Sequence, residues 1–125
     1  MTINIKSSTT LKEIRSSFSN YFNGLKLEFF RFPEAGYEGP HKLLQIDLNH
    51  TVDQFNDNLI DTSITLNPSD SVASFEEELS DILNVDVQVF RRSKELWIQT
   101  TTTDEWELER QNSKGLHSLE STFSS

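Results

Sequence analysis

An internal repeat constrains the fold of this chain more than any other feature of its sequence. Residues 3–31 align with residues 64–91 once one residue near Gly24 is left out. Apolar positions then meet apolar positions, as at Phe18 and Leu79. Asn23 meets Asn84, and the dipeptide Phe-Arg at 30–31 meets the same dipeptide at 90–91. Many β-α-β segments share apolar spacing, so the identical residues are what favour a duplication.

Both copies predict the same order of elements. The spacing of apolar residues is helical over 11–22 and again over 72–83. Thr10 and Ser71 are side chains that cap helix starts. Asn23-Gly24 and Asn84 suit the left-handed residue that often closes a helix. Alternating apolar residues then predict strands at 25–32 and 85–91.

The remainder of each copy predicts a further strand and a short helix. Pro33 ends the first strand, and the polar stretch PEAGYEGPHK predicts a loop before a strand at 43–48. In the second copy a hairpin at 92–95 leads into a strand at 96–100. Short helices are expected at 52–59 and 104–112, each opening with a capping box. The serine-rich tail from residue 113 is expected to be disordered.

These elements predict an α+β fold made of two tandem β-α-β-β-(α) repeats with pseudo-twofold symmetry. Sheets need a covered face, so the two long helices should pack on a sheet in two layers. Two domains of about 60 residues would each be marginal, which favours one shared core. We therefore expect a single domain over residues 1–112, with repeats at 1–62 and 63–112, and a disordered tail at 113–125.

A weak family resemblance accompanies this pattern. Residues 72–91 combine the helical pattern [LV]-x-x-[IF]-x-x-x-[FL] with a strand ending in Val-Phe-Arg, and Trp97 and the stretch TDEWEL from Thr103 follow. The chain thus resembles, over about residues 3–112, small uncharacterised bacterial proteins built from a duplicated β-α-β-β unit. The resemblance supports the fold expectation and implies no known activity, cofactor or site residue.

Composition excludes several classes of protein. The 125 residues contain no cysteine and carry a formal charge of −9, which excludes zinc-thiolate sites and argues against sequence-independent nucleic-acid binding. No apolar run is long enough to span a membrane, and the N-terminus lacks a signal-peptide profile. We expect a cytoplasmic protein without cofactors.

Catalytic and metal-binding patterns are not recognised in the sequence. His41, His50 and His117 do not accompany a nucleophile elbow. The two histidines at 41 and 50 are separated by a predicted strand, which does not give the short ligand spacing of a structural zinc site. We therefore predict neither catalytic nor metal-ligating residues.

Aromatic residues are predicted to gather on the sheet face opposite the helices. If Leu96 and Ile98 line the core, strand alternation sends the aromatic residues to the other face. This possible partner surface comprises Phe30, Phe32, Phe90, Arg92 and Trp97. Three interpretations remain open: a second sheet buries the aromatics, a partner or second copy covers them, or they line a small-molecule pocket.

A second candidate surface is acidic. Residues 1–62 hold 6 basic and 8 acidic groups, whereas residues 63–125 hold 5 and 12, so the net charges are −2 and −7. The second long helix carries Glu76, Glu77, Glu78 and Asp81. Consecutive helix residues point about 100° apart, so these carboxylates cannot converge on one ion by themselves. They form either a solvated helix face or a recognition surface for a basic partner.

The predicted function is a non-enzymatic interaction or structural module that acts through the aromatic sheet face. It would bind an unknown protein or a second copy of itself, with neither nucleic acid nor membrane as a direct partner. The alternative is an acidic regulator, either a nucleic-acid mimic or an inhibitor of a basic protein. A third class is an enzyme with an unrecognised site.

Overall fold

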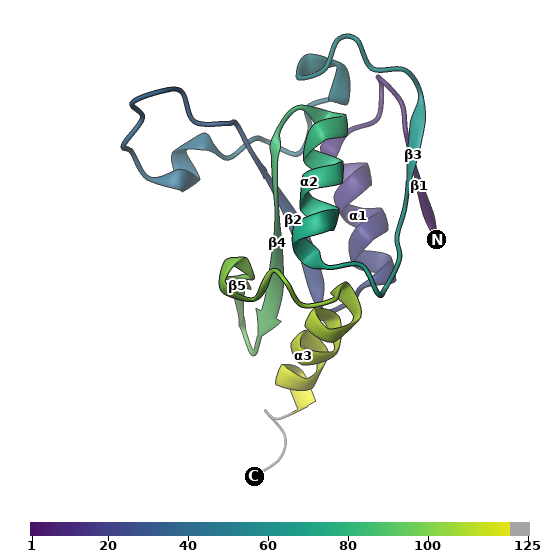
Figure 1. Cartoon of the computed structure of the whole chain (residues 1–125), viewed down its shortest axis with the longest axis vertical. Helices are drawn as coiled ribbons and strands as arrows, with labels where there is room; N and C mark the ends of the chain where they lie inside the picture. Colours follow the sequence, from purple (N-terminus) through teal and green to yellow (C-terminus); the bar gives the residue numbers. More distant parts are fainter. Residues whose placement is uncertain (121–125) are drawn as a thin grey trace.

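The computed structural model describes residues 1–120 and has an α+β architecture with three α-helices and two antiparallel sheets (Figure 1). The strands are β1 (Thr2–Ile5), β2 (Leu25–Phe30), β3 (Thr62–Thr65), β4 (Asp86–Ser93) and β5 (Leu96–Gln99). The helices are α1 (Leu11–Tyr21), α2 (Val72–Leu83) and α3 (Leu108–Glu120), with 3-10 turns at His41–Leu44, Val52–Gln54 and Thr101–Thr103.

The strands that flank each long helix lie in different sheets. β1 pairs with β3, with Ile3 opposite Ile64. The second sheet has the order β2-β4-β5, with Leu27 opposite Val89. In Figure 1, α1 and α2 lie between the long strands β2 and β4 on one side and the β1–β3 pair on the other.

A single hydrophobic cluster unites the elements of the two halves. Phe18 of α1 stacks on Phe75 of α2 with ring centroids 5.1 Å apart, and both residues are buried. The inward residues of β2 and β4 complete the cluster from the sheet side. The expected helix-on-sheet packing is therefore present.

Most predicted helix caps are confirmed, but two are wrong: the closure at Asn23-Gly24 and the capping box expected at residue 104, because α3 begins only at Leu108. The side chain of Thr10 accepts a hydrogen bond from the Glu13 N–H at 3.1 Å, and Ser71 does the same at the start of α2. Asn84 closes α2 in the left-handed conformation with φ 58°. The left-handed closure predicted at Asn23-Gly24 is wrong, because neither residue has a positive φ and α1 ends with Phe22 as its C-cap.

Two predicted elements of the first half are wrong. Residues 43–48 do not form a strand: the chain makes a 3-10 turn over His41–Leu44 and then a single antiparallel bridge from Gln45 to Phe30. The alternating apolar residues Leu44, Ile46 and Leu48 are half-buried or buried, but only Gln45 bridges to β2. The helix expected over 52–59 is only the 3-10 turn Val52–Gln54, although its capping box with Thr51 is present.

The C-terminal prediction also needs correction. Residues 113–120 are not a disordered tail but continue α3, and the predicted boundary at 112 falls inside this helix. The helix begins at Leu108 instead of 104. Its inward side buries Leu108, Gln111 and Gly115, which the serine-rich composition conceals. Residues 121–125 lie outside the described residues.

The Gly115 position explains how α3 approaches the sheet so closely. A Cβ at Gly115 would lie 2.5 Å from the carbonyl oxygen of Gly24, at the start of β2. The Gly24 N–H also donates to the side-chain oxygen of Asn112 at 2.7 Å.

No helix among residues 1–120 is long and apolar enough to cross a membrane.

Candidate functional site

The β2-β4-β5 sheet has an outer face that points away from α1 and α2. Residues opposite each other on neighbouring strands share a face, and the register places Lys26 opposite Phe90 and Arg92 opposite Trp97. Three of the five residues predicted for a partner surface, Phe90, Arg92 and Trp97, therefore come together here. Each is half-buried.

Two cations lie over the aromatic rings of this face. Lys26 Nζ is 5.0 Å from the centroid of the Trp97 ring and 5.7 Å from that of Phe90. The guanidinium carbon of Arg92 is 5.3 Å from the Trp97 ring. Such contacts are attractive because the ring face carries partial negative charge. We call Lys26, Phe90, Arg92 and Trp97 the cation-aromatic patch.

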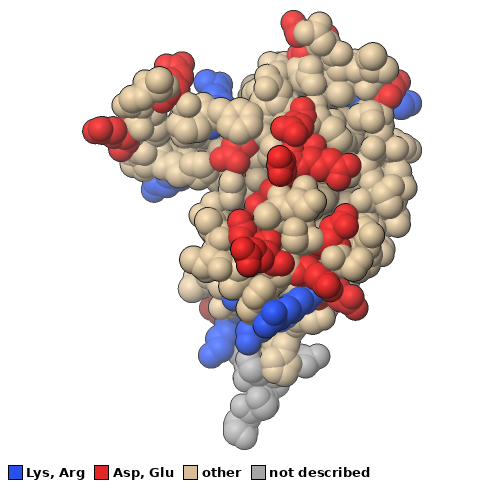
Figure 2. Space-filling view, viewed as in Figure 1, with Lys and Arg blue, Asp and Glu red and all other residues tan. Residues whose placement is uncertain are grey.

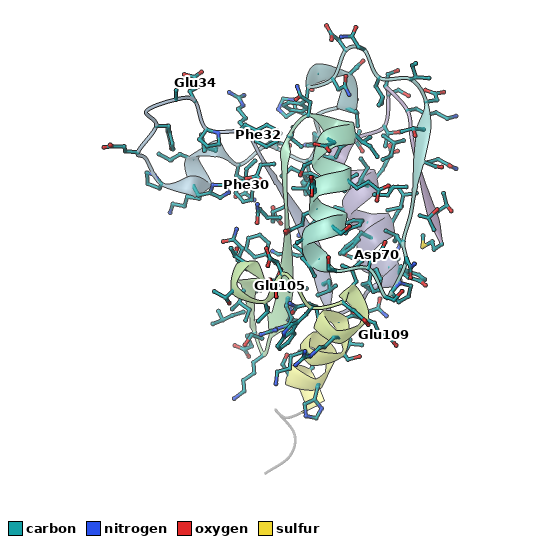
Figure 3. All side chains as sticks on the ribbon, viewed as in Figure 1. Phe30, Phe32, Glu34, Asp70, Glu105 and Glu109 are labelled. Atoms are coloured by element: carbon teal, nitrogen blue, oxygen red, sulfur yellow. The ribbon has the colours of Figure 1, made fainter. Side chains whose placement is uncertain are left out.

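Of the other two predicted residues, Phe30 lies on this same outer face and lines the adjoining pocket, whereas Phe32 lies outside the sheet. Phe30 is buried, and its ring packs against His41 with centroids 4.0 Å apart. Phe32 lies beyond the end of β2 and is 52% exposed (Figure 3). It stands at the base of the loop 33–40, which we call the projecting loop. The second sheet does not cover the outer face, because β1–β3 lies on the far side of the helices (Figure 1).

A pocket of about 370 Å³ opens beside the cation-aromatic patch. Its walls are the rings of Phe30, Phe90 and Trp97, and its polar groups come from β2, β5 and the segment 41–45. The lining includes Lys26, Glu28, His41, Lys42, Gln45 and Gln99. Aromatic walls with a few polar groups are typical of binding sites.

Glu28 is a buried carboxylate at the centre of a charge network that sequence reasoning missed. Its side chain is 8% exposed; one oxygen lies 3.1 Å from Arg15 Nη1 and 3.5 Å from Lys26 Nζ. The side-chain amide of Gln45 donates to its other oxygen. The signal in the sequence was the pair of charged residues at alternate positions of a strand otherwise built of Leu and Phe.

β5 is an edge strand of the sheet: it pairs with β4, and no further strand among residues 1–120 pairs with its other side. The Thr100 N–H donates to the Val89 carbonyl at 3.2 Å, so even-numbered residues of β5 direct their main-chain groups toward β4. The N–H and C=O groups of Trp97 and Gln99 consequently point to the free edge. Leu96 and Ile98, expected in the core, are instead 68% and 37% exposed, because α1 and α2 do not extend over β5.

Carboxylates gather over α2 and the segment before α3 (Figure 2). The N–H groups of Val72 and Ala73 donate to the carbonyls of Trp106 and Asp104, which holds the two segments side by side. We call this the acidic surface: Glu76, Glu77, Glu78, Asp81, Asp104, Glu105, Glu107 and Glu109. Within residues 1–120 none of these carboxylates has an ion pair.

Glu76 differs from the other acidic residues of α2. Its carboxylate turns toward β4 and accepts the Val89 N–H at 2.7 Å, whereas Glu77, Glu78 and Asp81 are exposed. Burial raises the pKa of Glu76 to about 7, against the lowering effect of the Val89 hydrogen bond. The negative charges of Asp104 and Asp86 raise the pKa further.

The histidines lie apart from one another. His41 Nε2 is 3.9 Å from a carboxylate oxygen of Asp86, His50 bonds Gln54 at 2.6 Å, and His117 lies on α3. Over the described part of the chain, no three His, Asp or Glu side chains are grouped to hold a metal ion.

No known protein family, curated protein or solved structure matches the chain. Its resemblance to duplicated bacterial proteins stays a prediction.

Proposed function

We propose that this protein is a non-enzymatic interaction module that binds an extended segment of a partner protein along the free edge of β5. The observation that carries the proposal is the open edge itself. Trp97 and Gln99 offer main-chain donors and acceptors there, and an added strand would pair with them. Edge strands are usually covered, charged or interrupted, whereas β5 exposes the apolar side chains of Leu96 and Ile98.

The side chains beside the edge indicate the chemistry of the partner segment. On the helix side of the sheet, Leu96 and Ile98 favour apolar side chains. On the outer face, Arg92 and Lys26 lie over Trp97 and favour acidic side chains. Residues of an extended strand point alternately to the two faces. The partner segment should therefore alternate apolar with acidic residues.

The charge of the chain favours a different protein over a second copy at this edge. Each copy carries −9, and the acidic surface belongs to the same half of the sequence as β5. Pairing two copies through β5 would bring like charges together. A short acidic segment brings fewer charges and meets Arg92 and Lys26 directly.

The main test removes one main-chain donor from the free edge. Gln99→Pro deletes an N–H that points away from β4 and spares the ladder to β4. Gln99→Ala is the matched control, because it loses the same side-chain bond to Gln88 but keeps the N–H. The probe is a peptide of alternating valine and glutamate, followed by the β5 amide signals in NMR. We expect binding to wild type and Gln99→Ala and at least about tenfold weaker binding to Gln99→Pro.

Several outcomes would overturn the proposal. One is equal peptide binding by both Gln99 variants, and another is equal binding of a valine-lysine peptide. Self-association of the chain that Gln99→Pro abolishes would assign the edge to a second copy. Replacing Trp97 and Phe90 with Ser tests the aromatic face: unchanged peptide binding by this folded variant would contradict its role.

The acidic surface supports a second candidate function, binding of a basic protein. The observation that favours it is the set of seven acidic residues besides Glu76, none of which has an ion pair in residues 1–120. Binding to polylysine should weaken steeply as salt rises. Glu77→Lys with Asp81→Lys should weaken it more than Glu34→Lys with Glu38→Lys, which reverse two charges in the projecting loop. A salt-insensitive complex would eliminate this candidate.

We also propose that the two halves arose by duplication and are related by a pseudo-twofold axis. Matched hydrogen bonds support this idea. Leu11 and Val72 donate to the carbonyls of His50 and Trp106, and Val52 and Leu108 donate to those of Thr9 and Asp70. Phe30 bridges to Gln45 as Phe90 pairs with Gln99. Relatives whose halves do not align at these positions would contradict a duplication.

A further inference from the structure

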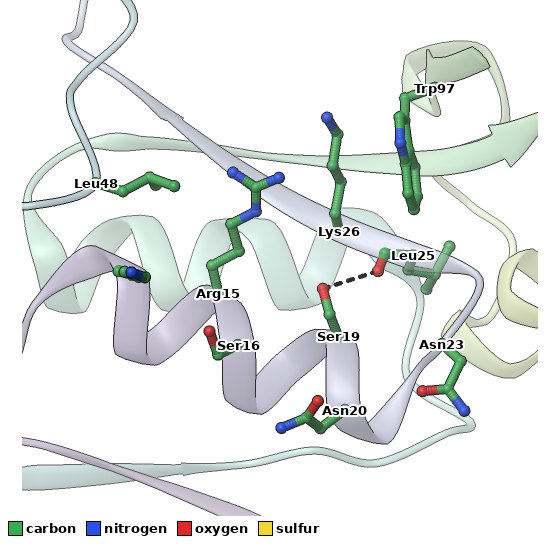
Figure 4. Close-up of a pocket in the computed structure, with 10 residues that line it drawn as sticks. Arg15, Ser16, Ser19, Asn20, Asn23, Leu25, Lys26, Leu48 and Trp97 are labelled. Carbon is green, nitrogen blue, oxygen red and sulfur yellow. Dashed lines mark hydrogen bonds between the residues drawn. The ribbon is translucent and has the colours of Figure 1, made fainter. Parts of the chain in front are cut away.

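A second pocket, of about 470 Å³, lies between α1 and the start of β2 (Figure 4). Its lining combines three cationic side chains with neutral polar groups, two leucines and an indole, and includes no carboxylate. The lining residues are Lys12, Arg15, Ser16, Ser19, Asn20, Asn23, Leu25, Lys26, Leu48 and Trp97. A pocket of this charge is unexpected in a chain with a net charge of −9.

The pocket holds hydrogen-bond donors that the fold does not use. Lys12 is exposed and has no ion pair within residues 1–120. Arg15 uses Nη1 on Glu28, which leaves further N–H groups of its guanidinium. The side chains of Asn20 and Asn23 form no hydrogen bond in the described chain, whereas the Ser19 hydroxyl donates to the Leu25 carbonyl.

Charge and shape together indicate the ligand. Lys12, Arg15 and Lys26 supply three positive charges, and the buried carboxylate of Glu28 offsets one of them. Asp47 lines the adjoining pocket with the same three cations. A net positive charge still remains, and it suits a phosphate group, which guanidinium and ammonium groups bind through charge-assisted hydrogen bonds. Figure 4 shows the side chains of Arg15 and Lys26 extending in the same direction, with the Trp97 ring beside Lys26. A flat ring can contact the edge of the indole, whose face already carries Lys26 and Arg92, while the phosphate meets the cations.

We infer that this pocket binds a small anion that carries a phosphate group and a flat ring, the chemistry of a mononucleotide. Arg15 and Lys12 would bind the phosphate, and Trp97 would contact the ring. The inference does not rest on the proposed peptide-binding edge, since Lys12, Arg15 and Asn20 lie outside that edge. The two proposals share Trp97, which contributes side-chain contacts to the pocket and main-chain groups to the edge, and Lys26, whose ammonium serves both.

Tryptophan fluorescence provides a direct test. The chain has two tryptophans, so Trp106→Phe leaves Trp97 as the only reporter. Titration with adenosine monophosphate should change the emission of this variant. Inorganic phosphate and adenosine supply the two halves of the probe separately. We expect adenosine monophosphate to bind at least about tenfold more tightly than either, because only it engages both the cations and the indole.

Variants at exposed positions of α1 assign the site. Lys12→Gln removes a positive charge and Asn20→Asp adds a negative one, and each should weaken binding about fivefold in low salt. Lys6→Gln makes the same charge change outside the pocket and should leave the affinity unchanged. Circular dichroism confirms that the variants are folded.

Three results would overturn the inference. The first is no response to millimolar adenosine monophosphate, and the second is equal affinity in wild type, Lys12→Gln and Asn20→Asp. The third is adenosine binding as tightly as its monophosphate. Peptide binding at the β5 edge is measured separately with Gln99→Pro, which leaves the cations of the pocket in place, so either proposal can fail alone.

Discussion

The two helix-strand units, α1-β2 and α2-β4, use aligned positions for opposite charges. Arg15 of α1 aligns with Glu76 of α2, and Glu28 of β2 aligns with Gln88 of β4. Arg15 reaches the Glu28 carboxylate, whereas Glu76 accepts the Val89 N–H of its neighbouring strand. The fold thus accepts either sign of charge at this place. The charges are free to serve different surfaces.

The difference extends to the surroundings of each unit. In the first, cations gather around a buried carboxylate and beside a pocket. In the second, the carboxylates of α2 adjoin those of the segment before α3 and form no ion pair within residues 1–120. The net charges of −2 and −7 therefore belong to two halves of the sequence that share one core but differ in surface chemistry.

The largest expected effect concerns α3. Its counterpart in the first half is only the short 3-10 turn Val52–Gln54. Gly115→Ala places a Cβ 2.5 Å from the Gly24 carbonyl oxygen, so the helix must shift away from the sheet. We expect a loss of about 3 kcal/mol of unfolding free energy in urea, despite the better helix propensity of Ala. Ser113→Ala, at an exposed position of α3, should be nearly neutral. Equal stability of the two variants would show that this close packing is absent.

The charge network of the first unit gives the next effect. Glu28→Gln leaves Arg15 and Lys26 without a carboxylate, and we expect a loss of about 2 kcal/mol, since both cations retain some access to water. Gln88→Ala at the aligned position should cost less than about 0.5 kcal/mol. Chemical denaturation measures both. A larger effect at Gln88 would reverse the comparison.

Glu76 gives the second unit a pH dependence. Its pKa is raised to about 7, so the folded state holds a proton that the unfolded state releases above pH 4.5. The stabilisation that this bound proton gives the folded state is fully present below pH 4.5 and is lost as the pH rises through about 7. Glu76→Gln should therefore stabilise the protein by roughly 1.5 kcal/mol at pH 8 and much less at pH 5, allowing for partial exposure.

The matched control for this pH effect is Glu77→Gln, which removes the same charge from an exposed position of α2. Its effect on the unfolding free energy should be small and similar at pH 5 and pH 8. Thermal unfolding of wild type and both variants at the two pH values checks the prediction. A Glu76→Gln effect that does not grow with pH would contradict a protonated Glu76 in the folded state.

The smallest expected effect compares the two aligned asparagines at the helix ends. Asn84 has φ 58°, and its side-chain amide donates to the Phe55 carbonyl at 2.9 Å. Asn84→Ala should cost about 1 kcal/mol, because Ala tolerates the left-handed conformation poorly. Asn23→Ala should have little effect, since Asn23 lacks a positive φ. Equal melting-temperature shifts would contradict this difference.

Sequence reasoning correctly predicted the helices and strands whose apolar spacing is strong. It predicted α1, α2, β2, β4 and β5 to within a few residues, as well as the caps at Thr10 and Ser71. It missed the C-terminal part of α3, because a helix with few apolar residues depends on burying Gln111 and packing Gly115. It also predicted a strand at 43–48 from alternation alone, although a strand forms only where a neighbour pairs along its length.

The candidate site was predicted only in part. Strand alternation correctly placed Phe30, Phe90, Arg92 and Trp97 on one face, although His41 covers Phe30. Phe32 lies outside the sheet. The contacts of Glu28 with Arg15 and Gln45 could not be foreseen, since they join β2 to α1 and to a bridge residue far away in the sequence.

The sequence by itself determined the local elements, the shared apolar core and the uneven charge of the two halves. These properties depend on spacing and composition within short segments, which any reader of the sequence can count. Only the tertiary structure decided which strands pair, where α3 packs and which charges meet. Strand partners and side-chain neighbours are set by contacts between residues far apart in the chain, where many arrangements satisfy the same pattern. The open β5 edge and the cationic pocket both follow from that choice.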